Sequence, residues 1–359
     1  MVKTVPEPDY VLRGHQVAVN SIRFVDEDHL ASGSLDGCLK LWNLTTRRVF
    51  TSISNAHSDS ITAVRILGGS SDPTVITGSR DGFVKGWAMS GEVPAFAYGT
   101  GARHFCGCAV VPGNTNLILA PSAEESTCLL VDIRAKVPQV RLRAPSELGM
   151  ITSLALDSST SEGLPLVATL GTESGSILMV DLRHYGVSET PVEATVKPDP
   201  HLIDFRDSRP KRIFENAHNG QPVMATKVFG HVGEHGLFTL YSCGADRKVA
   251  QRVCAPGRET SVRCTEAVNP SAGTSSLALR ADGKILAAGS WDGAVRVFET
   301  RGMRPLAVMR QHRDCVFDVD YAPPLMGDDF QVLASASKDC TIMIWSLYGK
   351  KKEEDVFAF

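Results

Sequence analysis

The sequence predicts an all-β fold in which seven four-stranded sheets form a ring, a seven-bladed propeller. Segments 30–44 and 333–347 share one pattern: an apolar run, small polar residues, an aspartate, then alternating apolar residues around a tryptophan. Aspartate suits a tight turn, and alternating Ile, Leu and Trp suit a half-buried strand, so each segment predicts two strands joined by a turn. The pattern recurs at intervals typical of a four-stranded propeller blade.

Seven turns can be placed along the chain. They lie at Asp36, Asp81, Glu125, Ser174, Asp246, Asp292 and Asp339, with successive intervals of 45, 44, 49, 72, 46 and 47 residues. Blades three and four are weak copies, because Val131 and Val180 stand where other units have Trp. The long interval predicts an insertion at 185–215, between blades four and five, that holds one edge strand and a mobile loop.

Each repeat stops at its third strand, so the outer strand of a blade comes from the residues that lead to the next unit. Blade seven then lacks an outer strand, and Tyr10–Arg13 is left over at the start of the chain. We predict that this N-terminal strand closes the ring, because closure removes an exposed sheet edge. The expected organisation is an N-terminal tail at 1–9, the propeller at 10–348 and a disordered charged tail at 349–359.

Composition excludes several classes of function. Apolar residues make up 43% of the chain and charged residues 21%, and the net charge of −3 argues against direct nucleic-acid binding. The nine cysteines show no zinc-site spacing, which favours buried thiols in a reducing compartment and no metal. We find neither the apolar run of a signal peptide nor a membrane span, and we expect no membrane partner.

The repeated residues resemble the WD-repeat family, which has Gly-His before a blade, Ser or Thr and Asp near the turn, and Trp on the third strand. In that family the His, the Ser or Thr, the Asp and the Trp form a buried hydrogen-bonded group, a structural tetrad. The resemblance implies three tetrads: His15, Ser32, Asp36 and Trp42; His57, Thr77, Asp81 and Trp87; and His312, Ser335, Asp339 and Trp345. Blade five has Arg252 in place of Trp, and blade six keeps Asp292 but has no His. The other members of the fifth group are His218, Ser242 and Asp246.

Several short segments are similar to one subgroup, the G-protein-beta-subunit-like protein 1 group, to which the fungal ASTRA-associated protein 1 belongs. The segments are Tyr10–Gly14, His104–Cys106, 287–298, 303–308, 335–339 and 344–348. Members are propeller adaptors that act with the Tel2-Tti co-chaperone complex in the assembly and stability of large phosphatidylinositol-3-kinase-related kinases. The fungal members are linked to chromatin regulation. The resemblance therefore implies a non-enzymatic scaffold that binds such proteins in the nucleus and cytoplasm.

Catalysis is not indicated. The histidines His15, His57, His218 and His312 recur in phase with the blades, so a structural role explains them better than a catalytic one. We find no zinc-protease motif, phosphate-binding glycine loop or nucleophile elbow. The sequence therefore predicts no enzyme activity, no cofactor and no small-molecule substrate.

Surface positions near the turns are the better candidates for function. In a propeller the residue before the turn acid projects towards one rim, here called the top face. These residues are Leu35, Arg80, Glu124, Glu173, Ala245, Trp291 and Lys338. Exposed Trp and Arg are typical binding hot spots, and we predict a patch for protein partners made of Trp291, Phe317, Arg80 and Lys338. The alternatives are that Trp291 packs on a neighbouring blade and that Phe317 belongs to the core.

Two weaker patterns leave a second function open. Asp132-Ile-Arg134 and Asp181-Leu-Arg183 are similar to the box of WD-repeat receptors of cullin-4 ubiquitin ligases, although the preceding aromatic residue is missing. Ordinary turn polarity explains them equally simply, and a substrate receptor is the alternative function. Lys350–Lys352 reads either as a nuclear address or as a solvated tail.

Overall fold

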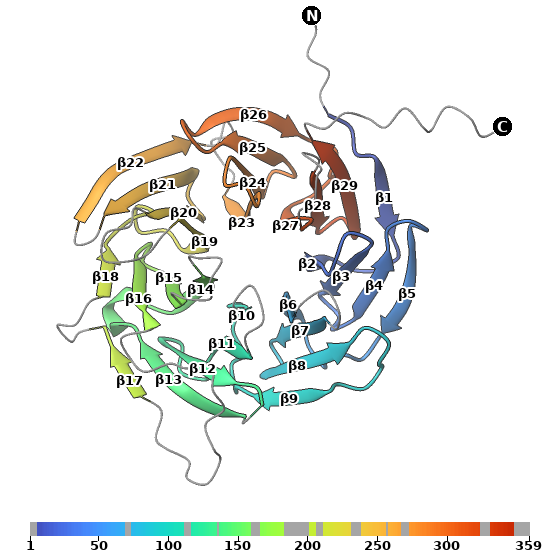
Figure 1. The fold of residues 1–359 in the computed structure, drawn as a ribbon, viewed down its shortest axis with the longest axis horizontal. Coiled ribbons are helices and arrows are strands. Elements are labelled where there is room, and N and C mark those ends of the chain that lie inside the picture. The colour runs from blue at the N-terminus through green and yellow to red at the C-terminus, as the bar shows by residue number, and fades with distance from the viewer. Residues whose placement is uncertain are drawn as a thin grey trace, which may run out of the picture.

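The computed structural model confirms the seven-bladed propeller. It describes residues 6–68, 73–110, 116–134, 136–158, 166–182, 201–205, 211–230, 238–255, 258–266, 273–323 and 331–347. Their strands form seven sheets around a common axis (Figure 1), of which six have four strands and one has five.

The first four blades begin one after another along the chain, although β17 of blade three follows β16 of blade four. Blade one contains β2 (Val19–Phe24), β3 (His29–Ser34), β4 (Leu39–Asn43) and β5 (Arg48–Ile53). Blade two contains β6 (Ile61–Leu67), β7 (Thr74–Ser79), β8 (Phe83–Ala88) and β9 (Phe96–Gly99). Blade three contains β10 (Ala109–Val110), β11 (Leu117–Pro121), β12 (Thr127–Asp132), β13 (Val137–Arg143) and β17 (His201–Asp204). Blade four contains β14 (Ile151–Ser158), β15 (Leu166–Thr172), β16 (Ile177–Asp181) and β18 (Lys211–Phe214).

The last three blades complete the ring. Blade five contains β19 (Val223–Gly230), β20 (Phe238–Gly244), β21 (Lys248–Ala255) and β22 (Arg258–Glu266). Blade six contains β23 (Thr274–Leu279), β24 (Ile285–Ser290), β25 (Val295–Glu299) and β26 (Arg304–Met309). Blade seven contains β27 (Val316–Tyr321), β28 (Gln331–Ser337), β29 (Thr341–Leu347) and β1 (Tyr10–Arg13). A short 3-10 helix, η1 (Ser146–Leu148), precedes β14.

The turn between the second and third strands of blade one shows why the repeated phrase folds in this way. The Asp36 carboxylate accepts hydrogen bonds from the Ser34 hydroxyl and the Cys38 N–H, at 2.6 and 3.3 Å. Gly37 has a φ of 78°, and a Cβ there would collide with the carbonyl oxygen of His57. Aspartate therefore satisfies the turn's polar groups, and glycine supplies the left-handed backbone.

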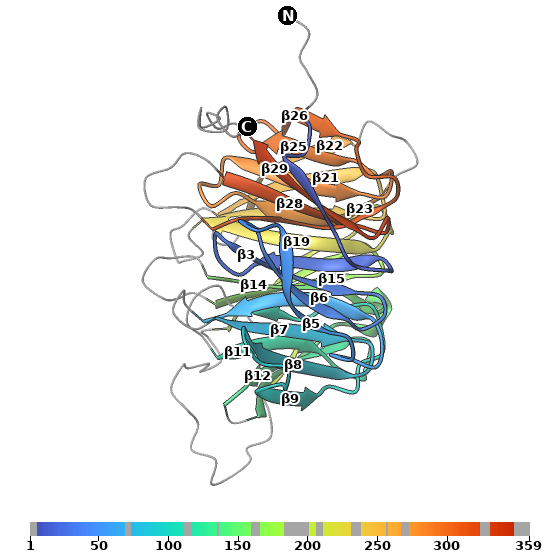
Figure 2. The same ribbon diagram turned by 90° about the vertical axis from the view of Figure 1, so that its right-hand side faces the viewer.

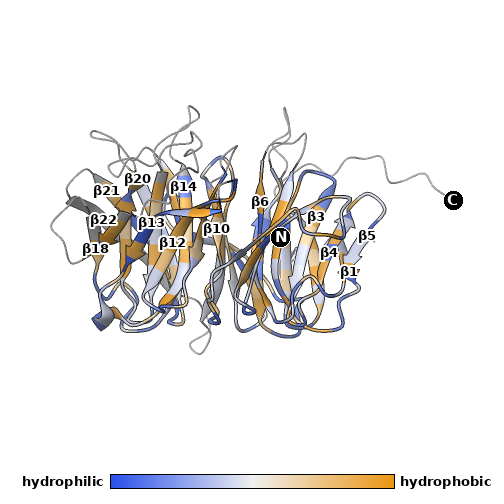
Figure 3. Cartoon of the chain, turned by 90° about the horizontal axis from the view of Figure 1, so that it is seen from below, coloured by the Kyte–Doolittle hydropathy of each residue, from blue (hydrophilic) through white to orange (hydrophobic). Residues whose placement is uncertain are grey.

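Strands cross the thickness of the disc, so the turns gather on its two faces (Figure 2). Apolar colour is concentrated in the strands, and hydrophilic colour in the turns at the faces (Figure 3). The blades pack on each other through buried side chains, and the innermost strands of neighbouring blades, such as β2 and β6, lie against each other. The residues exposed for a function therefore lie in the turns on the faces and on the outer strands.

The ring closes on its outer side as predicted. β1 pairs antiparallel with β29, with Tyr10 opposite Ile344 and Arg13 opposite Thr341, and this strand pairing confirms closure by the N-terminal strand. Leu12 is only 2% exposed and belongs to an apolar cluster shared by blades seven and one. The first and last blades therefore share a sheet edge and a core.

A second closure lies on the inner side. The Asp318 carboxylate in β27 accepts a hydrogen bond from the Ile22 N–H in β2 at 3.1 Å, and Asp320 accepts one from the Phe24 N–H at 2.9 Å. Arg23 Nη1 lies 3.4 Å from Asp318 and 3.5 Å from Asp320. Carboxylates of the last blade thus satisfy main-chain donors of the first, and the arginine between them offsets their charge.

The insertion at 185–215 contributes two strands to the described structure, where the sequence predicted one. β18 is the outer strand of blade four, whereas β17 pairs parallel to β13 as a fifth strand of blade three. The chain therefore passes from blade four to blade three and back. Residues 183–200 and 206–210, and the tail at 349–359, lie outside the described residues, so the mobile loop and the disordered tail remain predictions.

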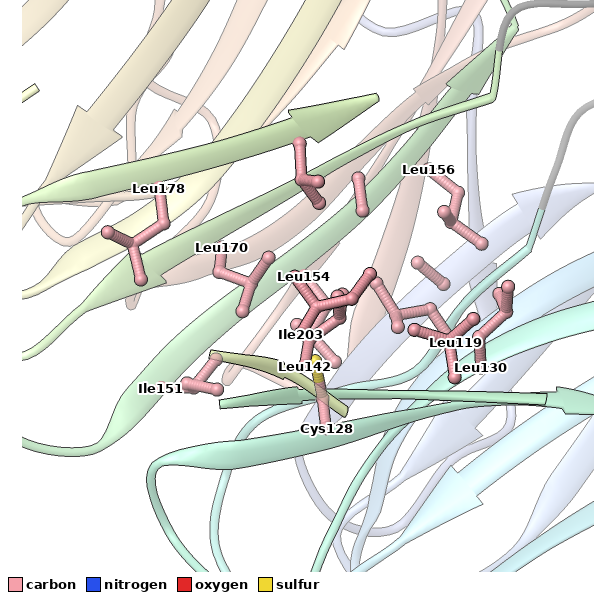
Figure 4. Close-up of a cluster of buried hydrophobic side chains, with 14 of the residues drawn as sticks. Leu119, Cys128, Leu130, Leu142, Ile151, Leu154, Leu156, Leu170, Leu178 and Ile203 are labelled. Atoms are coloured by element: carbon pink, nitrogen blue, oxygen red, sulfur yellow. The ribbon is translucent and has the colours of Figure 1, made fainter. Parts of the chain in front are cut away.

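β17 covers an apolar core between blades three and four. Ile203 and Phe205 are 1% and 4% exposed and join a buried cluster that includes Leu142, Leu154 and Leu170 (Figure 4). The parallel pairing could not be read from the sequence, because a strand of four residues carries no signal for the sheet that it joins.

Candidate functional site

Blades two and seven contain complete tetrads. His57 Nδ1 lies 2.9 Å from the Asp81 carboxylate and its Nε2 lies 2.7 Å from the Thr77 hydroxyl, to which the indole N–H of Trp87 donates at 2.8 Å. The seventh blade repeats this arrangement. There the corresponding distances join His312 to Asp339 at 3.0 Å, His312 to Ser335 at 2.8 Å, and Trp345 to Ser335 at 2.9 Å.

Hydrogen bonds within each tetrad occupy the polar groups of its residues. Burial lowers the pKa of His57, and the neighbouring Asp81 carboxylate opposes this shift. Burial would raise the pKa of Asp339, but hydrogen bonds from His312 and Thr341 outweigh it and hold this pKa below its ordinary value. A carboxylate fixed in this way supports the turn and is not available as a proton acceptor for a substrate.

Blade one departs from the family pattern. His15 and the Trp42 indole both hydrogen bond to the Ser32 hydroxyl at 2.7 Å, but the Asp36 carboxylate faces its own turn instead of the histidine. Burial, reinforced by the charge of Lys40, lowers the pKa of His15 to about 4. Without a hydrogen-bonded carboxylate, this imidazole is neutral at physiological pH.

In blade five, arginine replaces tryptophan as the donor. Arg252 is 6% exposed, and its Nη1 donates to the Ser242 hydroxyl at 3.1 Å while Nη2 donates to the Ala217 carbonyl at 3.2 Å. His218 bonds to the same Ser242 hydroxyl at 2.9 Å and to Asp246 at 2.8 Å. The guanidinium thus supplies the N–H that the indole supplies elsewhere, and the group keeps its connectivity.

In blade six, arginine takes the place of histidine. Arg296 is 2% exposed and donates to both oxygens of Asp292, at 2.8 and 2.6 Å. This bidentate pair supports the turn that follows β24. Arg296 was not among the residues predicted from the sequence, although an arginine in an otherwise apolar strand beside a turn lacking its histidine is a recognisable signal.

The residues that precede the turn acid occupy equivalent positions in six blades. Each main-chain N–H donates, at 2.9 to 3.1 Å, to the carbonyl of the residue just before the innermost strand of its blade. The pairs are Leu35–Ala18, Arg80–Ser60, Glu173–Met150, Ala245–Pro222, Trp291–Gly273 and Lys338–Cys315. These side chains therefore belong to the same face of the ring, which is the top face of the prediction.

Trp291 is held rigidly on this face and remains 39% exposed. Its carbonyl accepts a hydrogen bond from the Cys315 thiol at 3.0 Å, which ties blade six to blade seven. A Cβ at Gly273 would lie 2.9 Å from Cε3 and Cζ3 of the indole, so one edge of the ring packs on bare backbone. This contact of the ring lies within its own blade six and not on a neighbouring blade, and the role of the ring in binding a partner stays a prediction.

Lys338 is linked to this tryptophan through Cys315, and Phe317 lies further along β27. Cys315 accepts the Lys338 N–H, and Lys338 Nζ lies 3.3 Å from the Asp314 carboxylate. Phe317 follows two residues later in β27, where a register shift between Val316 and Asp318 leaves it without a ladder partner. It is half-buried, which leaves its predicted role in binding open.

The innermost strands of other blades carry the same irregularity. The equivalent bulge residues are Asn20, Thr62, Thr152, Met224, Ser275 and Phe317. Asn20 and Thr152 use their side chains to hydrogen bond to the next blade, at 3.0 Å to Ile61 and 2.7 Å to Val223. Phe317 brings an aromatic ring to a position that polar residues use to link blades.

Arg80 lies apart from the other three predicted residues. It belongs to blade two, and its guanidinium lies over the ring of Phe105 in the loop before β10, 4.5 Å from the ring centroid. Phe105 is 76% exposed. The structure thus links Trp291 and Lys338 through Cys315 and places Arg80 in a separate aromatic pair, whereas the role of Phe317 in the patch stays a prediction.

Other kinds of site are not indicated within the described residues. No group of three or more His, Cys, Asp or Glu side chains is arranged to hold a metal ion there. The helices of that part of the chain are all too short or too polar to span a membrane. Arg134 donates to its own Asp132 at 3.1 and 2.7 Å, so an internal ion pair already uses the charge of the box-like motif. Arg183 lies outside the described residues.

Comparison with known proteins agrees with the repeat. Segments 6–43, 48–88, 265–299 and 303–346 match the WD40 family, described as WD domain, G-beta repeat. The chain therefore contains WD40 repeats in these four segments. The matched segments fall on blades one, two, six and seven, whereas the apolar contacts that replace tetrads lie in blades three and four.

Whole-length relatives share the subgroup indicated by the sequence. The chain is 27% identical over 361 residues to guanine nucleotide-binding protein subunit beta-like protein 1 of Mus musculus, covering 96% of this chain and 97% of the mouse protein. It is 25% identical over 399 residues to ASTRA-associated protein 1 of Schizosaccharomyces pombe, covering 96% of this chain and all of that protein (100%). These values confirm the predicted resemblance at modest identity.

A solved structure shares the fold. The β-propeller domain of Cps50 (Swd1) from Myceliophthora thermophila superposes with a TM-score of 0.67 over 95% of this WD-repeat chain and 99% of the other. The two sequences are 18% identical, so this likeness concerns the fold alone.

Proposed function

We propose that this WD-repeat protein is a non-enzymatic adaptor that helps the Tel2-Tti type of co-chaperone complex to assemble and stabilise phosphatidylinositol-3-kinase-related kinases. A link to chromatin regulation and a location in both nucleus and cytoplasm belong to the same proposal. Its support is the full-length similarity to proteins named ASTRA-associated protein 1. WD40 propellers are typically scaffolds rather than enzymes, which agrees with an adaptor role.

The observation that carries the proposal is the rigid, exposed tryptophan on the top face. Hydrogen bonds to Gly273 and Cys315 hold the Trp291 main chain, and packing of one indole edge on Gly273 restricts the ring before a partner covers it. Lys338 adds a charged group beside it. Such a fixed aromatic residue with a polar rim is typical of the centre of a protein interface.

Affinity purification of the tagged full chain, followed by mass spectrometry, tests this proposal. We expect Tel2-Tti proteins and large kinases among the recovered partners, and we expect Trp291→Ala to lower their recovery at least about tenfold, as for a hot-spot residue. Phe50→Ala is the matched control, because Phe50 is 47% exposed but lies on the outer strand of blade one.

The two variants separate folding from binding. Both should melt at the temperature of the unmodified protein, since each removes a partly exposed ring. Unchanged recovery of the partners by Trp291→Ala would contradict the proposed surface. Absence of Tel2-Tti proteins and kinases from the purification would contradict the proposed function.

A further inference from the structure

The top surface of blades six and seven has one carboxylate facing two guanidinium groups. Asp292 already receives two hydrogen bonds from the buried Arg296, and Arg310 Nη1 also lies 3.1 Å from its Oδ2 atom. Arg296 is 2% exposed, whereas the Arg310 side chain is 52% exposed. One carboxylate can offset only one of the two positive charges, so the surplus charge appears at the surface on Arg310.

Further cations lie in the loop before β27 and in the turn after β28. Arg313 is exposed, and Lys338 is 54% exposed beside the 43% exposed Asp314. Asp339, in the turn between β28 and β29, is 9% exposed and paired with His312. The exposed groups here are therefore mainly basic, although the chain as a whole carries a net charge of −3.

Trp291 connects these charges into one surface. It directly precedes Asp292, to which Arg310 is bound, and its carbonyl is bonded to Cys315, whose own carbonyl accepts the Lys338 N–H. Trp291 is thus linked to Arg310 through Asp292 and to Lys338 through Cys315. We call Trp291, Arg310, Arg313 and Lys338 the blade-six/seven patch.

We propose that the blade-six/seven patch binds an acidic peptide segment of a partner protein, with an apolar side chain packed on Trp291 and carboxylates paired with the surrounding cations. This inference rests on the proposed adaptor function and specifies the partner segment that the surface takes. A carboxylate at Arg310 would supply the counter-charge that Asp292 cannot provide for two guanidinium groups. A basic segment would meet three exposed cations against one exposed carboxylate, that of Asp314, and would be repelled.

Selection from a display library of short random peptides on the purified full chain tests the inference. We expect the selected peptides to be enriched in Asp and Glu around one apolar residue. A labelled selected peptide should then bind the Arg310→Gln and Arg313→Glu variants at least about fivefold more weakly, the effect of losing a surface ion pair of about 1 kcal/mol. Its affinity should also fall as salt is added.

Arg48→Glu is the control, because Arg48 is an exposed arginine at the start of β5, away from the blade-six/seven patch. It should bind the peptide as the unmodified chain does. All variants are first checked for an unchanged melting temperature. Arg313→Glu keeps the test valid if Arg310→Gln disturbs Asp292, because the Arg313 side chain is exposed and only its main-chain N–H is bonded to Asp339.

The inference is overturned if no peptides are enriched, if they are neutral or basic, or if Arg310→Gln and Arg313→Glu bind as well as the unmodified chain. It is also overturned if the full chain self-associates and Arg310→Gln abolishes that association, since a second copy would then be the occupant. The outcomes that reject the acidic segment differ from those that reject the adaptor function. Partner recovery that depends on Trp291, together with peptides that are not acidic, would leave the adaptor function in place and reject the acidic segment.

Discussion

At the scale of single residues, two arginines preserve hydrogen bonds whose usual donors are absent. Arg252 gives Ser242 the N–H that tryptophan gives in three other blades, and Arg296 binds the Asp292 carboxylate where histidine is missing. Burial of a guanidinium is tolerated because its donors meet a hydroxyl, a carbonyl or a carboxylate. The geometry around the turn is thereby retained although the residue types differ.

Substitution at Arg252 tests this replacement. We expect Arg252→Ala to lower the free energy of unfolding by about 2 kcal/mol, because the Ala217 carbonyl and the Ser242 hydroxyl lose a buried donor. Arg252→Trp should be less harmful than Arg252→Ala, since an indole N–H occupies this slot in blades one, two and seven. Urea denaturation of the two variants decides the order, and a more stable Arg252→Ala would contradict it.

The lowered pKa of His15 predicts that the stability of the folded chain depends on pH. Its pKa of about 4 in the folded chain lies below the ordinary 6.5, so the unfolded chain binds a proton between these values and the folded chain does not. The free energy of unfolding should therefore be highest above pH 6.5 and fall as the pH decreases towards 4, by up to about 3 kcal/mol from this residue.

The variant His15→Gln isolates this contribution, because glutamine can still donate to Ser32 but does not titrate. Chemical denaturation between pH 7 and about 4.5 should give a smaller loss of stability for His15→Gln than for the unmodified chain. Equal losses in the two proteins would show that protonation of His15 does not oppose folding.

At the scale of elements, β17 stabilises blade three, as hydrogen-bonded tetrads stabilise other blades. Blades three and four lack the His, Asp and Trp combination, and the boundary between them is held by an apolar cluster that includes Ile203 and Phe205. A four-residue strand gains little from hydrogen bonds alone, but burial of two large side chains contributes a few kcal/mol. The insertion is thus part of the propeller core as well as a connection between blades.

Two neighbouring residues of β17 provide a matched test. We expect Ile203→Ala to lower the free energy of unfolding by about 2–4 kcal/mol, because Ile203 is 1% exposed. Leu202→Ala should change it by less than about 0.5 kcal/mol, because Leu202 is 52% exposed on the same strand. Thermal and urea unfolding measure both, and similar effects would mean that the strand does not seal the cluster.

At the scale of the whole molecule, the ring is closed at two places, at its outer edge and near its axis. β1 completes the outer edge of blade seven, and Asp318 and Asp320 hold the main chain of blade one near the axis. Both contacts join residues from the two ends of the chain, so closure comes at a large cost in chain entropy and adds to the cooperativity of the fold.

Leu12→Asp tests the outer closure. Leu12 is 2% exposed, so a carboxylate there should detach β1, lower the free energy of unfolding by about 3 kcal/mol or more, and leave β29 as an open edge. Hydrogen exchange should then reveal faster exchange of the β29 amides. Arg13→Asp serves as the control on the same strand, because Arg13 is exposed, and it should leave that exchange unchanged.

By itself, the sequence determined the number of blades, the places of the turns and the closing strand, because these follow from a local pattern repeated about every 45 residues. It also singled out Trp291, since an apolar residue in a polar turn is a local anomaly. Only the tertiary structure decided the roles of Arg252 and Arg296, the pairing of β17 with blade three and the separation of Arg80 from Trp291. Each of these depends on which distant groups lie within hydrogen-bonding or packing distance, and no repeat period carries that information.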